Sequence, residues 1–352
     1  MKLLIICGGQ STEHVVSRMS CASVLKNIHK DKYEITLVGI DLKGCWYTLD
    51  IDQFIYNEDH KNPDRDIWLD DATQVEDVYD LIKSQDVVFP VLHGKYGEDG
   101  TIQGLFELAK TPYVGCRTMG SAIAMDKIYT KKVLETAGIP QVKSLYVKQR
   151  YDGEFIVVDN QFNERKDVLE VVKEELGFPI FMKASSSGSS VGCYRVDNEE
   201  DFYDKLEEAG QYDRKIVIEE CIDCIELETA VLGNDDVMVS RVGQIMPHGE
   251  FYTFESKYED EESKTCIPAL VDKDIQEQIR KYAIKVFKAI DGHGLSRVDF
   301  FLDKKTNKIY LNEINTMPGF TKISMYPQLM ADSGISYSDL IDKLIDLALE
   351  VH

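Results

Sequence analysis

Residues Arg297–Gly319, which read RVDFFLDKKTNKIYLNEINTMPG, predict a β-hairpin because two apolar-rich runs flank a polar turn. Side chains alternate between the two faces of a strand, so Arg297 and Asp299 share one face of the first strand. By the same rule, Glu313 and Asn315 share one face of the second. If these faces coincide, two carboxylates, an amide oxygen and a guanidinium converge. Mg²⁺ binds such oxygen ligands and completes its shell with substrate phosphates. The alternative is an exposed hairpin with a local salt bridge, because Asp and Glu are usually solvated.

Composition limits the classes of function. At 352 residues the chain is long enough for two or three domains with sizeable cores. Its formal net charge of −22 argues against nucleic-acid binding, which needs a basic surface. An anionic substrate would therefore have to be met by a local basic pocket.

Targeting signals and cysteine usage favour a cytoplasmic protein without a membrane partner. The apolar run Leu3–Cys7 is too short for a signal-peptide core, and no stretch approaches the length of a membrane span. The eight cysteines are scattered, which favours reduced thiols over a disulfide framework. Cys221 and Cys224 form a C-x-x-C pair, but no second pair or histidine cluster completes a zinc site. Two ordinary thiols are the favoured interpretation.

The first part of the chain alternates strand and helix signals. Three apolar runs are predicted as strands: Leu3–Cys7, Ile35–Ile40 and Asp86–Leu92. Thr12 is predicted to cap the helix that follows the first strand. The apolar face of that helix would carry Val15, Met19, Ala22, Leu25 and Ile28. This order predicts a parallel sheet, in which ligands bind at the carboxyl ends of the strands. The loops Gly8–Ser11 and His93–Gly100 follow such ends.

The remainder of the chain is predicted to be α+β. Its predicted strands are Pro179–Lys183, Val191–Val196, Lys215–Glu219, Leu227–Leu232 and Val237–Gln244. Its predicted helices are Ser121–Leu134, Asn198–Leu206, Lys273–Ile290 and Tyr337–Leu349. A long loop, Pro247–Cys266, precedes the third of these helices. Two polar stretches, Asn57–Asp77 and Asp152–Arg165, are predicted as surface excursions, the second of them a hairpin or loop.

The loop Ser185–Gly192, SSSGSSVG, is the second strong feature. Its glycines and serines offer backbone N–H groups and hydroxyls that can surround phosphate oxygens. The spacing matches neither a P-loop nor a dinucleotide fingerprint, and the loop joins two strands. Lys183 precedes it and would place a positive charge on the phosphates. A flexible surface turn is the alternative interpretation.

Taken together, these features resemble the D-alanine–D-alanine ligase family of the ATP-grasp fold, over nearly the whole chain. Each motif is weak alone, but seven stand in the order of the family. They are GGQSTEHVVS (Gly8–Ser17), HGKYGEDGTIQG (His93–Gly104), MDK (Met125–Lys127), GSSVG (Gly188–Gly192), SKY (Ser256–Tyr258), SRVDFF (Ser296–Phe301) and LNEINTMPG (Leu311–Gly319).

The resemblance implies an N-terminal parallel-sheet domain of Rossmann-like, pre-ATP-grasp type, followed by a two-lobed ATP-grasp. The expected bounds are 1–118 for the N-terminal substrate-binding domain, 119–222 for the central subdomain and 223–352 for the C-terminal subdomain. It further implies ATP as co-substrate, two Mg²⁺ ions with Mn²⁺ as a substitute, and K⁺ as an accessory ion. D-Alanine would be the amino-acid substrate, and a homodimer is expected.

Site residues follow from the resemblance position by position. Glu13 would bind the ammonium of the first D-alanine and form a relay with Ser189 and Tyr258. Arg297 and the backbone near Gly319 would stabilise the tetrahedral intermediate. ATP would be bound by Lys127, Lys183, Ser190, Glu219, Glu226 and Lys257. The metal ligands would be Asp299, Glu313 and Asn315. The other substrate-binding positions would be His93, Glu98, Ser324 and Met325, although a plain core or surface role for His93 stays open.

Three positions depart from the family pattern without removing a catalytic group. Ala184 stands where proline is usual, Cys224 where glycine is usual, and Phe254 where tyrosine is frequent. The alternative substrate is D-serine as the second amino acid, as in vancomycin-resistance relatives. Those relatives commonly carry Glu-Lys-Tyr in the long loop, whereas this chain has a small residue, Ser256, before Lys257. D-Alanine is therefore the favoured second substrate.

Two other classes serve as contrasts. Another ATP-grasp enzyme, such as a biotin-type carboxylase, would keep the metal hairpin without the GGQSTEHVVS and SKY motifs. A non-catalytic nucleotide-binding protein would keep the fold and lose charged groups, all of which are present here.

Overall fold

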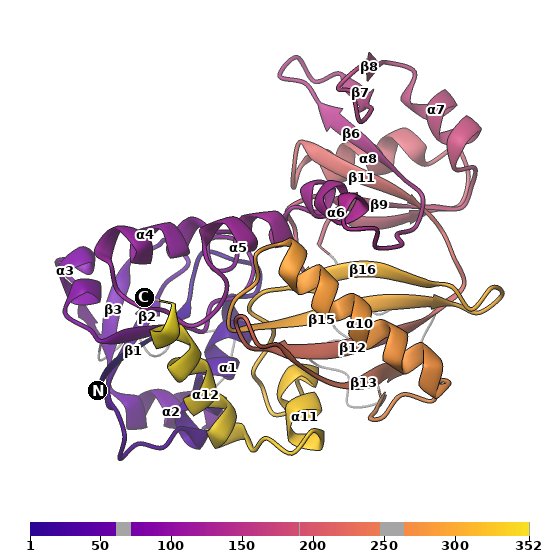
Figure 1. Ribbon diagram of the computed structural model, residues 1–352. Coiled ribbons are helices and arrows are strands. Elements are labelled where there is room, and N and C mark those ends of the chain that lie inside the picture. The colour runs from indigo at the N-terminus through magenta and orange to yellow at the C-terminus, as the bar shows by residue number, and fades with distance from the viewer. Residues whose placement is uncertain (61–71, 190, 247–263, 352) are drawn as a thin grey trace.

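The described residues of this computed structural model, 1–60, 72–189, 191–246 and 264–351, form three β-sheets (Figure 1). The first sheet lies in the N-terminal lobe with strand order β4-β3-β2-β1-β5. The second, order β10-β9-β11-β6-β7-β8, forms the central lobe at the top of the view. The third, order β14-β13-β12-β15-β16, contains the hairpin predicted within Arg297–Gly319. The predicted combination of an α/β segment followed by two α+β lobes is confirmed.

The N-terminal sheet is mixed rather than purely parallel. Its strands are β1 (Lys2–Gly8), β2 (Glu34–Ile40), β3 (Trp46–Leu49), β4 (Thr73–Gln74) and β5 (Val87–Pro90). β1 pairs in parallel with β2 and β5, as predicted, whereas β3 and β4 extend the sheet in antiparallel fashion. Its helices are α1 (His14–Asn27), α2 (Ile51–His60), α3 (Val78–Lys83) and α4 (Thr101–Ala109). The excursion predicted at Asn57–Asp77 lies partly outside the described residues.

Helix α1 corrects two details of the sequence-based prediction. It begins at His14, and its N-cap residue is Glu13, which makes no capping hydrogen bond through its side chain, so Thr12 is not the cap. Of the predicted apolar face, Ala22, Leu25 and Ile28 are buried, whereas Met19 is 37% exposed. Val24 joins the buried face in its place. The N-cap residue Glu13, directly before the first turn, is itself buried.

The central sheet is antiparallel throughout its pairings. Its strands are β6 (Ser144–Gln149), β7 (Phe155–Val158), β8 (Glu164–Arg165), β9 (Ile180–Ala184), β10 (Cys193–Val196) and β11 (Lys215–Glu220). The polar stretch predicted as a hairpin forms β7 and β8. The helices of this region are α5 (Thr118–Met125), α6 (Lys127–Thr136), α7 (Val168–Glu175) and α8 (Phe202–Gly210). α7 was not predicted, and α8 begins four residues later than expected.

A single helix predicted over Ser121–Leu134 is two helices, with the break at Asp126. The Asp126 backbone is extended, and its carboxylate accepts hydrogen bonds from the N–H groups of Ile128 and Tyr129. An aspartate cap satisfies the free N–H groups of a helix start, which explains why α6 restarts here. The break places Lys127 in the first turn of α6, beside the Ser185–Gly192 loop.

The C-terminal sheet is antiparallel and carries helices on its faces. Its strands are β12 (Cys224–Leu232), β13 (Met238–Met246), β14 (Lys264–Cys266), β15 (Leu295–Asp303) and β16 (Ile309–Asn315). The helices are α10 (Lys273–Ala289), α11 (Met325–Asp332) and α12 (Tyr337–Glu350); α11 was not predicted. Figure 1 shows α10 lying across the sheet and α12 running back over the N-terminal lobe.

One core joins the two ends of the chain. The apolar face of α12, including Leu344, shares a cluster of buried residues with Leu3 and Ile5 of β1. At the end of this interface Asp342 accepts hydrogen bonds from Tyr33 and His29. The C-terminal helix therefore shares one core with the N-terminal sheet, to which Ala230 of β12 and Leu295 of β15 also belong. Met317 and Phe320, just after the hairpin, belong to the same core.

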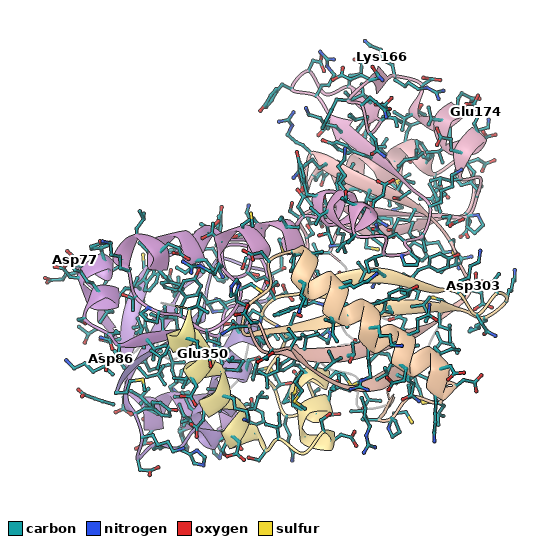
Figure 2. The ribbon with its side chains drawn as sticks, viewed as in Figure 1. Asp77, Asp86, Lys166, Glu174, Asp303 and Glu350 are labelled. Atoms are coloured by element: carbon teal, nitrogen blue, oxygen red, sulfur yellow. The ribbon has the colours of Figure 1, made fainter. Side chains whose placement is uncertain are left out.

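Two further observations concern membrane-spanning helices and disulfide bonds. No helix in the described ranges is both long and apolar enough to cross a membrane. All eight cysteines are described, and each is a free thiol. Charged side chains cover the outer surfaces, as Figure 2 shows for Asp86 in the N-terminal lobe, Lys166 and Glu174 in the central lobe and Asp303 at the hairpin turn.

Candidate active site

The hairpin of β15 and β16 forms as predicted. Its register brings together the four predicted polar side chains, Arg297, Asp299, Glu313 and Asn315. β15 and β16 pair antiparallel with Arg297 opposite Asn315 and Asp299 opposite Glu313. The register shifts directly after Asp299, where a β-bulge interrupts the ladder. Bulges re-aim side chains next to functional sites. The alternation rule therefore predicted the correct faces. The alternative, an exposed hairpin with solvated carboxylates, is wrong for Asp299, which is buried.

Arg297 is held by two carboxylates. Its Nε and Nη2 atoms donate to the two Asp299 oxygens at 2.8 and 2.7 Å, and Nε lies 3.0 Å from Glu228 Oε2 on β12. Burial acts against the charge, but Asp299 and Glu228 outweigh it and raise the pKa of Arg297 well above its ordinary value. Glu228 was missed from the sequence. The signal was an acidic residue two positions after Glu226, on the same face of β12, where a buried glutamate requires a partner.

The carboxylate and amide set fits a hard cation that is completed by phosphates. Asn315 Nδ2 donates to Asp299 Oδ2 at 3.0 Å, and Glu313 faces Asp299 across the strand pair. Within the described ranges, no three His, Cys, Asp or Glu side chains form a ready-made metal cage. Mg²⁺ does not need one, because it binds through one or two carboxylates plus substrate oxygens. The donor set therefore matches a divalent ion that arrives with a nucleotide.

Lys127 connects the hairpin to the Ser185–Gly192 loop. Its Nζ donates to the Ser187 carbonyl at 2.6 Å and lies 3.9 Å from Glu313 Oε2. Its backbone N–H donates to the Ser185 carbonyl at 3.0 Å. The Ser185 hydroxyl in turn donates to Asp126 at 2.6 Å. A cation thus lies between the predicted metal ligands and the predicted phosphate loop.

A second group of cations surrounds Glu219. Lys183 and Lys131 each lie 2.6 Å from one of its oxygens. Burial raises the pKa of Glu219, but the two lysines outweigh it and lower that pKa to about 2. Burial likewise disfavours the charge of Lys183, while Glu219 keeps its pKa above the ordinary value. Lys183 also donates to Asn312 on β16 at 3.3 Å, across the two sheets. Lys131 was missed, and its place one helical turn after Lys127 was the available signal.

The N-terminal lobe meets the loop through Glu13. The Ser189 hydroxyl donates to Glu13 Oε1, so two residues 176 positions apart are brought together as predicted. The backbone packs tightly here: a Cβ on Gly94 would stand 2.4 Å from Glu13 Oε2, and one on Gly188 would stand 2.9 Å away. Glycine at both positions lets the two loops close on one carboxylate.

His93 and Glu98 both bind the backbone at Met317. The Met317 carbonyl accepts from His93 Nδ1 at 2.9 Å, and the Met317 N–H donates to Glu98 at 3.3 Å. Glu98 also accepts from the Gly94 N–H at 2.9 Å. Burial and the charge of Glu13 raise the pKa of Glu98 to about 8. The hydrogen bonds from the Gly94 and Met317 N–H groups act in the opposite direction and lower it, but they are outweighed. Both predicted residues therefore lie beside the end of the hairpin strand, and the core alternative for His93 agrees with its burial.

The raised pKa of Glu98 predicts a dependence of stability on pH. A carboxyl with a pKa near 8 when folded and about 4.5 when unfolded takes up a proton on folding between those values, so the free energy of unfolding falls as pH rises through that range. We expect Glu98→Gln, which cannot ionise, to remove part of this fall. Urea unfolding at several values between about pH 5 and pH 8 measures it. Parallel pH dependences in the two proteins would contradict the assignment.

The remaining predicted positions are distributed along β12 and the start of α11. Glu226 lies on β12 opposite Phe301. The Ser324 hydroxyl accepts from the Thr321 N–H at 3.0 Å and would contact a Cβ on Gly319 at 2.8 Å. Met325 is buried in the core shared with the N-terminal sheet, so its side chain faces away from the site. Ser190, Lys257 and Tyr258 lie outside the described residues, as does most of the long loop.

Comparison with known proteins agrees with this geometry. The family model described as "D-ala D-ala ligase N-terminus" matches residues 2–116, and "D-ala D-ala ligase C-terminus" matches 133–346. A D-alanine–D-alanine ligase of Acetivibrio thermocellus is 46% identical, with 99% of this chain and 96% of the relative covered. D-Alanine–D-alanine ligase B of Clostridium tetani is 47% identical over 99% of this chain and 94% of its own length.

Solved structures give the same result. The D-alanine–D-alanine ligase of Coxiella burnetii has a TM-score of 0.85 and 35% identity, covering 100% of this chain and 94% of its own. The VanG D-Ala:D-Ser ligase of Enterococcus faecalis has a TM-score of 0.84 at 35% identity, covering 99% of both chains. The hairpin, the glycine-serine loop and these full-length likenesses lead to one conclusion: this chain belongs to the D-alanine–D-alanine ligase family, with the ATP-grasp fold.

Proposed function

We propose that the chain joins two D-alanines into D-alanyl-D-alanine, at the expense of ATP, through an acyl-phosphate. The observation that carries this proposal is the cross-strand pair Asp299–Glu313 with Lys127 and Arg297 on either side. Carboxylates and cations in one place suit phosphoryl transfer, which depends on positioning and charge neutralisation more than on covalent chemistry. The dipeptide would serve peptidoglycan synthesis, the purpose implied by the family.

The proposed sequence has two steps. A carboxylate oxygen of the first D-alanine attacks the γ-phosphorus of ATP, and the bond from that phosphorus to the ADP oxygen breaks. The amine of the second D-alanine then attacks the acyl carbon, inorganic phosphate leaves, and the amine loses a proton. Bound Mg²⁺ would supply charge neutralisation at the phosphates, held by Asp299, Glu313 and Asn315.

The protein residues have separate tasks in this proposal. Lys127 and Lys183 hold phosphate oxygens, while Glu219 keeps Lys183 charged. Glu219 would also face the adenine and Glu226 the ribose. Arg297 faces the tetrahedral intermediate, where a preorganised cation stabilises developing negative charge. Ser190 and Lys257 would complete the phosphate contacts.

Substrate binding and exclusion of water complete the proposal. Glu13 would bind the ammonium of the first D-alanine, and its hydrogen bond from Ser189 would close the loop over the site together with Tyr258. Water would hydrolyse an acyl-phosphate, so a closed site is required. The backbone of Gly319 and the start of α11, at Ser324, would contact the intermediate and the second carboxylate. Met325 could take part only through its backbone N–H, because its side chain is buried elsewhere.

The second amino acid separates the main proposal from its alternative. Relatives that are 44–47% identical over nearly the whole chain are named D-alanine–D-alanine ligases, whereas the D-Ala:D-Ser ligase is 35% identical. These names support D-alanine. We expect purified protein with Mg-ATP to release phosphate with D-alanine alone and to form D-alanyl-D-alanine. More phosphate with D-alanine plus D-serine than with D-alanine alone, with the mixed dipeptide as product, would establish the alternative instead.

Other aspects of the proposal rest on the family resemblance. They are two Mg²⁺ ions per site with Mn²⁺ as a substitute, K⁺ as an accessory ion, a homodimer, a cytoplasmic location, and domain bounds of 1–118, 119–222 and 223–352. Metal titration of turnover tests the divalent ions and K⁺, and sedimentation of the purified protein tests the homodimer.

A further inference from the structure

Three hydrogen bonds close a ring around the segment that follows the hairpin. His93 Nδ1 lies 2.9 Å from the Met317 carbonyl, and His93 Nε2 lies 2.9 Å from Ser20 Oγ on α1. The same Ser20 oxygen accepts from the Phe320 N–H at 3.1 Å. Residues 317–320 are thereby fixed at both ends, by a histidine and a serine of the N-terminal lobe. Gly319, which the proposed function places at the tetrahedral intermediate, lies between these two anchors.

The direction of each bond follows from the chemistry of the partners. A carbonyl can only accept, so His93 Nδ1 carries a proton. Burial lowers the pKa of His93 and Arg297 lowers it further, against Glu13 and the Met317 carbonyl, so the ring is neutral and Nε2 accepts. Ser20 therefore donates its proton to Nε2 and accepts from Phe320. The single proton of the hydroxyl is therefore committed to His93, and the residue is completely buried.

We propose that Ser20 is a positioning residue for ligation: it selects the Nδ1–H tautomer of His93 and, with it, fixes the backbone at Gly319 against the reacting acyl group. This inference rests on the proposed function. It also changes the expectation for His93, whose two ring nitrogens are occupied by Met317 and Ser20. His93 thus acts on the substrate through the Met317–Phe320 backbone rather than by a hydrogen bond of its own.

Ser20→Ala tests the inference because it removes both interactions with little change in volume. We expect kcat to fall by about 10- to 100-fold, the scale of a misplaced catalytic group, with KM for ATP within about twofold. Ser20→Cys, whose thiol is a weak donor, should give an intermediate kcat. The matched control is Ser333→Ala, at the end of α11. Ser333 also accepts one backbone N–H, from Arg241, and donates to one carbonyl, that of Leu329. Its kcat should remain within about twofold of the wild type, because its side chain bonds to neither His93 nor residues 317–320.

A spectroscopic measurement separates positioning from mere stability. The chain has seven histidines, so selective ¹⁵N-histidine labelling gives few ring signals, and His93→Gln assigns the one of interest. We expect Nδ1–H with an unprotonated Nε2 in the wild type, and a mixture of tautomers in Ser20→Ala but not in Ser333→Ala. An Nε2–H tautomer in the wild type, or a Ser20→Ala protein with unchanged tautomer and kcat, would overturn the inference. Failure of the proposed function would appear differently, as absence of dipeptide from the wild type.

Discussion

Glu313→Gln should reduce kcat by about 1,000-fold or more while the protein stays folded, because it removes a carboxylate that we propose binds Mg²⁺ and so stabilises the transferring phosphoryl group. Glutamine keeps the shape of the side chain, so the packing of β16 against β15 is preserved. It removes the charge that faces Asp299 and that lies 3.9 Å from Lys127. The measurements are phosphate release and dipeptide formation with saturating Mg-ATP, together with thermal unfolding.

The matched control for this variant is Glu277→Gln on α10. Glu277 is exposed and pairs with Arg280 one helical turn away. The same loss of charge at that position should leave kcat within about twofold, since an exposed pair contributes little. Turnover of Glu313→Gln close to that of Glu277→Gln would refute the metal assignment. A scaffold protein without catalysis would also show no difference between the two.

Arg297→Lys should lower kcat by about 100- to 1,000-fold, with a smaller effect on KM for ATP. The substitution keeps a positive charge between Asp299 and Glu228, so the two buried carboxylates are not left without a cation. It loses the planar fork that binds both Asp299 oxygens, and a lysine at such a site is not a conservative replacement. The guanidinium that we propose faces the tetrahedral intermediate is lost with it.

Arg280→Lys provides the control for this substitution. Arg280 reaches from α10 to β13, where it donates to the Ser240 and Val239 carbonyls, and these contacts involve none of the proposed site residues. We expect its kcat to remain near that of the wild type. If Arg297→Lys kept more than about a third of wild-type turnover, the guanidinium would have no role in the reaction that a simple ammonium could not fill.

Sequence periodicity predicted the part of the site that depends on local geometry. The two-residue repeat of a strand was enough to place Arg297, Asp299, Glu313 and Asn315 on one face, and the register confirmed it. The loop between β9 and β10 was also located correctly from its glycines and serines. What the resemblance added was the substrate and the expectation that Glu13 and Ser189 meet, and the structure brings them together.

The missed residues are those whose role depends on tertiary contacts. Glu228 has no local partner in the sequence, and only the pairing of β12 with β15 places it beside Arg297. Lys131 pairs with Glu219 of β11, and only the packing of α6 beside that strand brings the two together. Ser20 lies 300 residues from Phe320, so nothing in the sequence near either residue indicates their hydrogen bond.

The errors in the helices have a similar cause. The periodic pattern between Ser121 and Leu134 is continuous, so it predicted one helix, but the hydrogen bonds of Asp126 end one helix and begin another. On α1 the assumed face included Met19, because an apolar residue at helical spacing was counted as core. The buried face contains the predicted Ala22 and Leu25 together with Val24, but not Met19. Propensity and period are weak where a cap or a tertiary contact decides.

The most direct test of the central claim is the fate of oxygen from the first substrate. D-Alanine labelled with ¹⁸O in its carboxylate is incubated with the protein and unlabelled Mg-ATP, and the released inorganic phosphate is analysed by mass. If the carboxylate attacks the γ-phosphorus and phosphate then leaves from the acyl carbon, one ¹⁸O atom appears in phosphate for each dipeptide formed. Dipeptide formed with unlabelled phosphate would contradict the acyl-phosphate, and with it the role assigned here to Arg297 and the Asp299–Glu313 pair.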